Sequence, residues 1–407
     1  MVPRLLALLL TLGLAAPAAG QEIASVLRKG GVNDGDTIIV RLHGTVQKIR
    51  FLGVQAFELT TYNNNDPSKW TGECNSVPAA RFVLKTVRQA GYRVRLSSPA
   101  PVTDKRGRLI RKIEVRLGGV WRDLSAMELE RGLVLWLHHV KDTSINQAYS
   151  TLEQQAALRG DGLWDPNDCA AGPYQDAKVA LRVFSDPLGE DTNLNDEWVR
   201  LDNTGTRDLP LDGWYLGNAG PKTERYRFPA GTVLRAGESF TVHTGTGTNG
   251  NGNFYKGLGH TIFENSYNGF GAGDAAYLLD PDGDVRAHSI YPCLVSCTDP
   301  NVGALAVHAN PIRGPEYVDV KNTSGHAIDL FDYELRVKGN YAFGPNSVLA
   351  PGETMRVFIK GSPSEDTRLE RHIGYPGAYM NDAGGTARVS TFDEIDLACD
   401  AWGSGRC

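Results

Sequence analysis

The sequence predicts a multidomain, mainly β protein in which a small α+β barrel precedes two β-sandwiches. Three observations support this fold class. The chain has 407 residues, more than the ~100 to 200 residues of one ordinary domain. Its 46 Gly and 21 Pro, against 4 Met, indicate many turns and therefore much β-structure. A composition of 41% apolar and 22% charged residues favours a globular chain over a disordered, collagenous or multi-span membrane one.

The first 20 residues have the layout of a secretory signal peptide. Arg4 precedes an uncharged run from Leu5 to Ala16, and small residues then lead to a cleavage site near Gln21. The run is shorter than the ~20 apolar residues that a membrane-spanning helix needs. We therefore expect residues 1–20 to be removed and the mature chain to be secreted, extracellular and without a transmembrane segment. An uncleaved helix at a membrane surface is the alternative.

Residues 21–170 alternate between strands and helices. Two β-branched runs, Thr37–Leu42 and Lys48–Val54, flank a turn at residues 43–45 and predict a hairpin. Further strands are expected over Tyr92–Leu96 and Leu109–Arg116, and helices over Pro78–Ala90, from Ser125 with Glu128 as a capping box, and from Ser144 with Gln147 as another. Five strands with interspersed helices suit a small Greek-key barrel of the OB type.

The second half of the chain contains an internal repeat. The segment that starts at Glu197 recurs at Glu316, an offset of 119 residues, and the segment at Val233 recurs at Val348, an offset of 115. Both copies show short alternating strands separated by turns, which is typical of an immunoglobulin-like β-sandwich. A linker-like segment separates the repeats from the barrel. The predicted domains are residues 21–170, 177–295 and 300–407.

The charge is distributed unevenly between the two halves. Residues 21–170 hold 21 Lys and Arg against 16 Asp and Glu, whereas residues 171–407 hold 20 against 31. The front section is therefore suited to meet an anion such as nucleic acid, although many solvated surfaces carry a similar balance.

The cysteine pattern fits an exported protein, because six cysteines can all pair. Several connectivities are open, and we prefer pairing within each domain. The spacings lack the paired short gaps of a zinc site. The disulfide candidates are Cys74 with Cys169, Cys293 with Cys297, and Cys399 with Cys407.

The densest group of chemically versatile side chains lies in the front section. Asp34 and Asp36 precede the first hairpin strand, and Gln55 and Glu58 follow the second, so the hairpin folds these residues back on each other. Such oxygen ligands hold hard cations like calcium, which also accepts backbone carbonyls. Arginines that converge on the cluster present planar forks matched to a phosphate. Carboxylate, cation and paired arginines are the components of phosphodiester hydrolysis.

The residue types alone also allow a simpler interpretation, in which Asp-Gly begins a hairpin and residues 104–108 form a charged surface turn. The order of the motifs is more specific. Asp34-Gly35-Asp36-Thr37, Arg50, Glu58 and Asp104-Lys105 with Gly107-Arg108 together resemble the staphylococcal nuclease (thermonuclease) family, over about residues 26–164. The family fold is an OB barrel with three helices.

The resemblance implies calcium-dependent hydrolysis of DNA or RNA, with 3′-phosphate products. By position, Arg50, Glu58 and Arg108 correspond to the catalytic residues, with Glu58 as the candidate general base and the arginines on the phosphate. The implied calcium site consists of Asp36, Asp34, Gln55 and Ala56, and the implied substrate contacts are Thr37, Lys105 and His138.

Three positions depart from the family pattern. Gln55 stands where the family has a second metal-binding aspartate, and its amide oxygen carries no negative charge. Phe57 replaces the proline that usually precedes the glutamate. His138 and His139 stand where the family places tyrosines near the nucleotide. Histidines at these positions either stack on a base or are surface residues without a functional role.

The repeats resemble lamin-tail domains, the immunoglobulin-like sandwiches of nuclear lamins that are also appended to secreted bacterial enzymes. Gly213-Trp214-Tyr215-Leu216 and Phe228-Pro229-Ala230-Gly231-Thr232 carry the match in the first copy, and Leu349-Ala350-Pro351-Gly352-Glu353 carries it in the second. The resemblance implies modules that hold the protein against a cell surface, a polymer or another partner.

The sequence therefore predicts a secreted, calcium-dependent nuclease of DNA or RNA with lamin-tail modules for tethering. Two alternatives stand beside it. One is a non-catalytic nucleic-acid-binding protein of the same fold, in which Gln55 spoils the metal site. The other is an extracellular adhesion or scaffold protein with a degenerate barrel.

Overall fold

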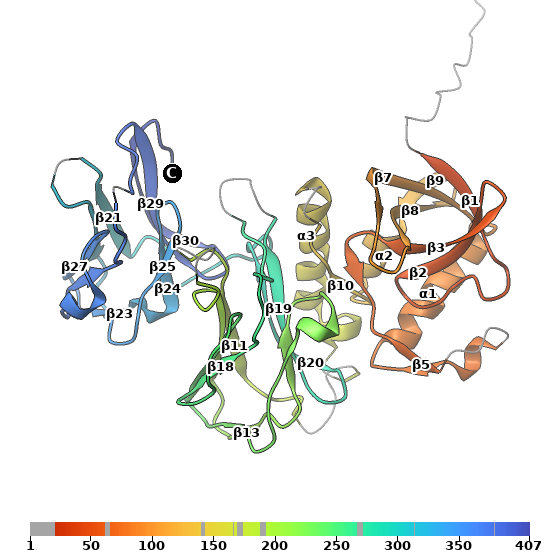
Figure 1. Ribbon diagram of the computed structural model, residues 1–407, viewed down its shortest axis with the longest axis horizontal. Coiled ribbons are helices and arrows are strands. Elements are labelled where there is room, and N and C mark those ends of the chain that lie inside the picture. The colour runs from red at the N-terminus through yellow and green to blue at the C-terminus, as the bar shows by residue number, and fades with distance from the viewer. Residues whose placement is uncertain are drawn as a thin grey trace, which may run out of the picture.

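A computed structural model describes residues 21–61, 66–139, 143–165, 167–168, 174–187, 193–266, 272–312, 314–377 and 379–407. Figure 1 shows three parts in a row, with the N-terminal barrel at one end and the second sandwich at the other. The expected signal peptide lies outside the described residues. Within the described ranges, no helix combines the length and apolar character that crossing a membrane requires.

The N-terminal part is a closed five-stranded barrel that is compatible with an OB fold. Its strands pair in the order β3-β2-β1-β7-β8, and a parallel contact between β3 and β8 closes the barrel. β9 continues the sheet beyond β8. The strands are β1 (Glu22–Val26), β2 (Thr37–Leu42), β3 (Thr45–Phe51), β7 (Arg93–Thr103), β8 (Leu109–Leu117) and β9 (Val120–Asp123).

The predicted hairpin is confirmed, since β2 and β3 pair antiparallel around the turn at His43 and Gly44. Both turn residues have positive φ angles, 47° and 82°, as a two-residue hairpin loop requires. Two short pairs flank the barrel: β4 (Val54–Gln55) with β10 (Leu135–Trp136), and β5 (Leu59–Thr61) with β6 (Thr71–Gly72).

Three α-helices occur in the described part of the chain: α1 (Ser76–Gln89), α2 (Leu124–Leu129) and α3 (Thr143–Arg159). The capping box predicted at Ser125 is wrong. Asp123 is the N-cap of α2, and its side chain accepts a hydrogen bond from the backbone N–H of Ala126. Ser125 and Glu128 are instead both fully buried, because tertiary packing turns them toward the barrel rather than toward the helix end.

The two sandwiches share one topology. In the first, the sheets have the orders β11-β12-β17-β18 and β15-β14-β19-β20, with an extra pair β13-β16. In the second, the corresponding orders are β21-β22-β27-β28 and β25-β24-β29-β30, with the extra pair β23-β26. In both copies the last pair of the first sheet is parallel and the other pairs are antiparallel.

The strand bounds of the sandwiches are as follows. The first contains β11 (Val179–Phe184), β12 (Trp198–Asn203), β13 (Leu209–Pro210), β14 (Tyr215–Gly217), β15 (Tyr226–Arg227), β16 (Val233–Leu234), β17 (Ser239–His243), β18 (Asn253–Tyr255), β19 (Asp274–Leu279) and β20 (Val285–Tyr291). The second contains β21 (Leu305–Asn310), β22 (Tyr317–Asn322), β23 (Ile328–Asp329), β24 (Tyr333–Arg336), β25 (Asn340–Ala342), β26 (Val348–Leu349), β27 (Thr354–Phe358), β28 (Glu370–His372), β29 (Gly384–Thr391) and β30 (Asp396–Gly403).

Helix α3 joins the barrel and the first sandwich into one packed unit. It lies between the barrel and the sheet that contains β19 and β20 (Figure 1). Tyr277, Leu279 and Ile290 of this sheet belong to the same hydrophobic core as the barrel strands. The hydroxyl of Tyr277 lies 3.0 Å from both carboxylate oxygens of Glu153 on α3. Burial raises the pKa of Glu153 to about 8, so this carboxyl group is largely neutral at pH 7.

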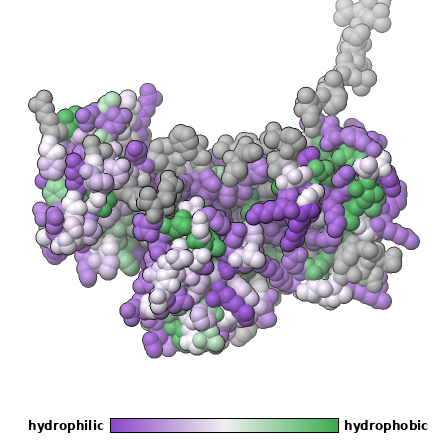
Figure 2. Space-filling model, viewed as in Figure 1, coloured by the Kyte–Doolittle hydropathy of each residue, from purple (hydrophilic) through white to green (hydrophobic). Residues whose placement is uncertain are grey.

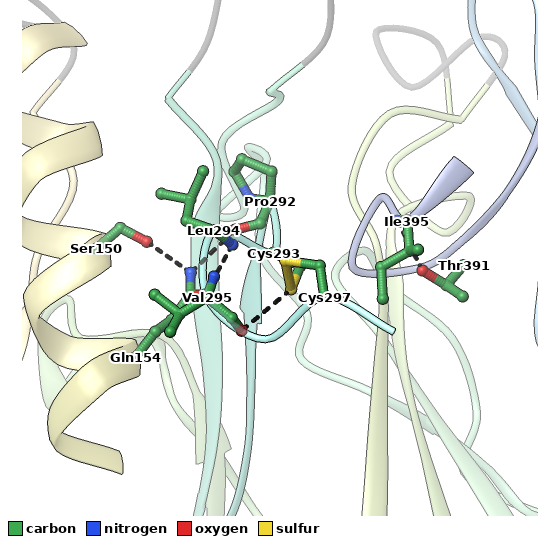
Figure 3. The surroundings of a disulfide bond; sticks show 9 residues. All are labelled: Ser150, Gln154, Pro292, Cys293, Leu294, Val295, Cys297, Thr391 and Ile395. Carbon is green, nitrogen blue, oxygen red and sulfur yellow. Dashed lines mark hydrogen bonds between the residues drawn. A yellow bond between two sulfur atoms is a disulfide. The ribbon is translucent and has the colours of Figure 1, made fainter. Parts of the chain in front are cut away.

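The segment that follows β20 and leads to the second sandwich passes beside α3. The Gln154 side chain donates to the carbonyl of Pro292 at 2.9 Å and accepts from the backbone N–H of Leu294 at 2.8 Å. The disulfide between Cys293 and Cys297 lies beside these contacts (Figure 3). An open cleft of about 750 Å³ is found here, lined by α3 and by both sandwiches.

Two of the predicted disulfides are confirmed. Cys293 pairs with Cys297, and Cys399 pairs with Cys407. Cys169 lies outside the described residues, so its pairing with Cys74 stays a prediction.

Candidate functional site

The outer face shown in Figure 2 is mainly hydrophilic, with hydrophobic residues in small separate patches. The chemically versatile residues are found instead where β2 and β3 meet beyond their hairpin. The register places Thr37 opposite Arg50. Arg50 forms an ion pair with Asp36, and the two side chains are only 9% and 6% exposed. The other Asp36 oxygen accepts a hydrogen bond from the Thr37 hydroxyl at 2.9 Å. The guanidinium is therefore held at a defined position with little solvent around it.

Gln55 and Ala56 complete this cluster at the end of β4. Arg50 donates to the Gln55 side-chain oxygen at 2.7 Å and to the Val54 carbonyl at 2.9 Å. The Gln55 side-chain amide donates to the Ala56 carbonyl at 2.8 Å, and the Ala56 N–H donates to Asp36 at 2.7 Å. Every Asp36, Gln55 and Ala56 oxygen that the resemblance assigns to calcium thus accepts a hydrogen bond from the protein itself.

This arrangement does not fit a calcium ion. Calcium takes about six to eight oxygen ligands and gains affinity from carboxylate charge. Of the residues in the described ranges, Asp36 supplies the carboxylate that contacts both Ala56 and Arg50, and the Arg50 guanidinium bridges Asp36 and Gln55. Among the described residues, no group of three or more His, Cys, Asp or Glu could hold a metal ion. We therefore derive no catalytic step through calcium.

Asp34 supports the cluster from the loop before β2. Its carboxylate accepts from the backbone N–H of Asp36 at 3.0 Å and from the Asn33 side chain at 2.7 Å. Burial raises its pKa, against the opposing effects of Asn33 and Arg50. A Cβ at Gly35 would lie 2.7 Å from the Cβ of Ala79 on α1. The glycine therefore lets this loop rest directly on the helix.

Glu128 is a buried acid that the sequence analysis did not recognise as part of this region. It is fully buried, and neither of its carboxylate oxygens has a hydrogen-bond partner among the residues that the structure describes. Burial, together with the nearby charges of Asp34 and Asp123, holds its pKa well above the usual range. Glu128 thus lies under the loop, with one carboxylate oxygen 3.6 Å from the position of a Cβ at Gly35, and its raised pKa favours the neutral acid over a charge that could bind a cation.

The turn between β7 and β8 brings a second guanidinium to the cluster. Asp104 accepts from the Arg108 Nε at 2.6 Å and from the backbone N–H of Arg108 at 2.9 Å. Arg108 then donates to the Thr37 hydroxyl at 3.2 Å. The parallel pairing of β3 with β8 explains why this distant turn lies beside β2. Lys105 is exposed in the same turn.

Glu58 lies immediately before β5 and has an exposed side chain. Its charge acts on Arg50, together with the charges of Asp34, Arg108 and Asp104. Burial is the dominant effect, and it lowers the pKa of Arg50 to about 10. The structure thus brings Arg50 and Arg108 together around Asp36 and Thr37, with Glu58 close enough for its charge to act on Arg50.

Comparison with known families concerns the part of the chain next to this site. The matched range begins in β11 and ends just after β20, so it spans both sheets of the first sandwich. Residues 181–292 match the Lamin Tail Domain. No curated protein matches the chain. The first sandwich is therefore called the lamin-tail domain below.

The structure places His138 against the lamin-tail domain and outside the Arg50 cluster. Its Nε2 lies 3.4 Å from Glu264 and its Nδ1 lies 3.4 Å from Asp274, and the side chain is 18% exposed. Burial opposes protonation of the ring, but the hydrogen bond and charge of Asp274 and the charge of Glu264 outweigh it and raise the His138 pKa. Of the predicted substrate-binding residues, His138 thus contacts another domain, whereas Thr37 lies inside the cluster.

Besides Glu128, the sequence analysis does not identify Glu73 and Lys222 as part of this region. Glu73 accepts the backbone N–H of Glu58 at 2.8 Å, and its second oxygen forms an ion pair with Lys222 of the lamin-tail domain. The contact joins residues 149 positions apart. No periodicity or local motif signals such a pair, because it depends on how the barrel and the lamin-tail domain pack.

Proposed function

We propose that the barrel cluster binds a phosphodiester group of DNA or RNA and hydrolyses it. The observation that supports the proposal most is the convergence of two guanidinium groups and one exposed carboxylate. Arg108 donates to Thr37, whose strand partner is Arg50, and the charge of Glu58 acts on Arg50. Planar guanidinium groups suit phosphate oxygens, and a carboxylate beside them can accept a proton.

In the proposed reaction, Glu58 accepts a proton from a water molecule whose oxygen attacks the phosphorus. Arg50 and Arg108 oppose the negative charge that develops on the phosphoryl oxygens. The bond from phosphorus to the 5′-oxygen breaks, this oxygen takes up a proton, and the phosphate stays on the 3′ side. Asp36 and Asp104 orient the two arginines through the contacts described above, so the positively charged groups are fixed before the substrate arrives.

The proposal includes export and tethering. The layout of residues 1–20 and the two disulfides support secretion, because disulfides persist in oxidising compartments. The lamin-tail domain and the second sandwich would hold the barrel near a cell surface or polymer partner.

The test of the proposal uses the mature chain, residues 21–407, with single-stranded DNA and RNA in calcium or in chelator. We expect cleavage with 3′-phosphate ends, and Glu58→Gln is expected to lower the cleavage rate by about 100-fold because it removes the base. The matched control is Glu370→Gln, at an exposed position of β28 in the second sandwich, which should leave the rate unchanged. A wild-type chain that cleaves neither substrate under either condition would refute the proposal.

The closed network around Arg50 favours a second candidate, a barrel that binds nucleic acid without cutting it. In this case Asp36 and Gln55 hold Arg50 permanently, and no cation replaces it. The expected signature is salt-sensitive binding without cleavage by the wild-type chain. Gln55→Asp, which restores a carboxylate, should then produce calcium-dependent cleavage. If Gln55→Asp has no effect on an already active enzyme, the second candidate is excluded.

A further inference from the structure

We infer that the lamin-tail domain positions the segment that carries Glu58, acting through Lys222 and Glu73. The inference rests on the proposed function, because it names positioning residues for the same reaction. The contact lies outside the phosphate-binding cluster, so substitution at Lys222 tests it without touching Arg50, Arg108 or Glu58.

Glu73 is the residue that fixes the backbone at Glu58. One Glu73 oxygen accepts the Glu58 N–H at 2.8 Å, and the Glu73 N–H donates to the Glu58 carbonyl at 3.1 Å. The two residues are therefore joined by reciprocal hydrogen bonds, next to the β5–β6 pair. A Cβ at Gly72 would lie 2.5 Å from the Glu58 carbonyl. The segment at Gly72 and Glu73 is thus in close contact with the backbone of Glu58, so a shift of Glu73 is transmitted to Glu58.

The lamin-tail domain surrounds the free side of Glu73. Lys222, in the short 3-10 helix Lys222–Glu224, forms the ion pair with its second oxygen. The charge of the half-buried Arg225 also interacts with Glu73. A Cβ at Gly283, in the turn before β20, would lie 3.9 Å from the Glu73 Cβ and Cγ. Two positive charges and one turn of the lamin-tail domain therefore meet the carboxylate that holds Glu58.

An exposed ion pair by itself contributes little to stability, and Lys222 is 53% exposed. This pair differs in its context, because the barrel and the lamin-tail domain already share a core through α3. The two partners are thus held close before the pair forms, and less side-chain and domain entropy is lost. The effect is expected on the position of Glu58 rather than on the global stability of the protein.

A positioning role predicts a change in kcat with little change in KM, because phosphate binding by the two arginines is unaffected. A purely structural role of the pair predicts no change in either constant. Hydrogen exchange of the backbone amides at 58–61 gives a second measurement that does not need catalysis.

The experiment compares Lys222→Met, Lys222→Arg and Glu73→Gln in the mature chain, with Lys321→Met as the control at an exposed position of β22 in the second sandwich. We expect Lys222→Met and Glu73→Gln to raise the amide exchange rates at residues 58–61 by about fivefold and to lower kcat by about fivefold. A change of this size corresponds to the loss of one ion pair. Lys222→Arg keeps the charge and is expected to behave like the wild-type chain, as is Lys321→Met.

Unchanged exchange at 58–61 in Lys222→Met would overturn the inference. Increased exchange with an unchanged kcat would also overturn it, because the contact would then be structural only. A wild-type chain without nuclease activity would refute the proposed function and the catalytic part of this inference. The exchange measurement would still show whether the lamin-tail domain controls the Glu58 segment, so the two failures are distinguishable.

Discussion

The two sandwiches keep the same internal hydrogen bonds at equivalent positions. Glu197 and Glu316 occupy matching positions in the repeat. Glu197 accepts the backbone N–H groups of Ile262 and Phe263 at 3.0 and 3.1 Å. In the same way, Glu316 accepts those of two consecutive residues, 379 and 380, at 2.8 and 3.1 Å. Each buried carboxylate thus fixes a loop to the start of a central strand.

A second pair of equivalent residues repeats this pattern. The Asn203 side chain donates to the carbonyls of Arg207 and Leu234, and the Asn322 side chain donates to those of His326 and residue 349. Buried polar groups of this kind need partners. The copies therefore retain the residues that satisfy their backbones, even though most other positions differ.

The outer faces of the two sandwiches, by contrast, differ in chemistry. In the lamin-tail domain the register places Tyr277 opposite Gly217, and Tyr277 packs into the core shared with the barrel. In the second sandwich the corresponding cross-strand pair is Arg388 opposite Arg336. Arg336 forms ion pairs with Glu334 and Glu394. One face is apolar and covered by a helix, and the other is charged.

The second sandwich joins its neighbour through both aromatic and polar contacts. Phe392 packs against Phe184 and Trp198 of the lamin-tail domain. Asp332 forms ion pairs with Arg182 and Arg200 of the lamin-tail domain at 2.7 and 3.0 Å. The guanidinium of Arg200 also lies 3.8 Å from the centre of the Phe331 ring, a cation–π arrangement. The comparison shows that the repeated residues determine the fold of each copy, whereas the variable outer residues determine what each copy docks against.

The largest expected effect on the free energy of unfolding comes from the apolar face of the lamin-tail domain. Tyr277→Ala is expected to lower the free energy of unfolding by about 3 kcal/mol, because it leaves a cavity in the core shared with the barrel. Arg388→Ala, at the equivalent position, is expected to lower it by less than about 1 kcal/mol, because the ion pair of Arg388 with Asp396 is partly exposed. Urea unfolding, followed by the intrinsic tryptophan fluorescence, measures both, because Trp164 lies beside Tyr277 and Trp402 lies in β30, the strand paired with that of Arg388.

Tyr277→Phe controls for a Tyr277→Ala chain that does not fold. It retains the ring and removes only the hydroxyl that contacts Glu153, so a loss of about 1 kcal/mol is expected. Equal losses for Tyr277→Ala and Arg388→Ala would show that the two outer faces do not differ as described.

The next largest expected effect on stability comes from the buried glutamate that both sandwiches share. Glu197→Gln and Glu316→Gln each replace an accepting oxygen by an amide group, and each is expected to lower the free energy of unfolding by about 2 kcal/mol. Glu197 also accepts from the Thr244 hydroxyl, so its loss should be the larger by about 1 kcal/mol. Thermal unfolding of both variants checks the order. A negligible loss in either copy would mean that the buried carboxylate is not a shared structural element.

Local patterns in the sequence were enough to predict several of these features. The hairpin from Thr37 to Phe51 and the disulfides between Cys293 and Cys297 and between Cys399 and Cys407 involve residues close in the chain. Their geometry depends on turns and short spacings, which propensity rules describe. The repeat was visible because the sandwiches need the same residues at the same offsets.

Features that depend on packing between distant segments were not predictable in this way. Ser125 and Asp123 are both good N-cap residues, and only burial against the barrel decides that Asp123 caps α2. The motifs name the residues of the Arg50 cluster, but they do not predict the bridge from Arg50 to Gln55, because the family pattern places a cation ligand at position 55. Glu73 and Lys222 carry no motif at all.

The smallest expected effect concerns pH and the contact between His138 and the lamin-tail domain. The folded pKa of His138 is raised by Asp274 and Glu264, against burial. Its contribution to stability is therefore complete below the unfolded pKa of about 6.5 and is lost as the pH rises through the folded pKa. We expect His138→Gln to be destabilising by about 1 kcal/mol at pH 6 and by less at pH 8.

His308→Gln is the control, because His308 also lies near a carboxylate, Asp400, but its side chain is 71% exposed. The unfolding midpoint of each variant is compared with that of the wild-type chain at the same pH. This difference removes the effect of the other buried acids, which titrate in all three proteins. An equal penalty for His138→Gln at pH 6 and pH 8 would show that the ring contacts the domain without carrying a proton.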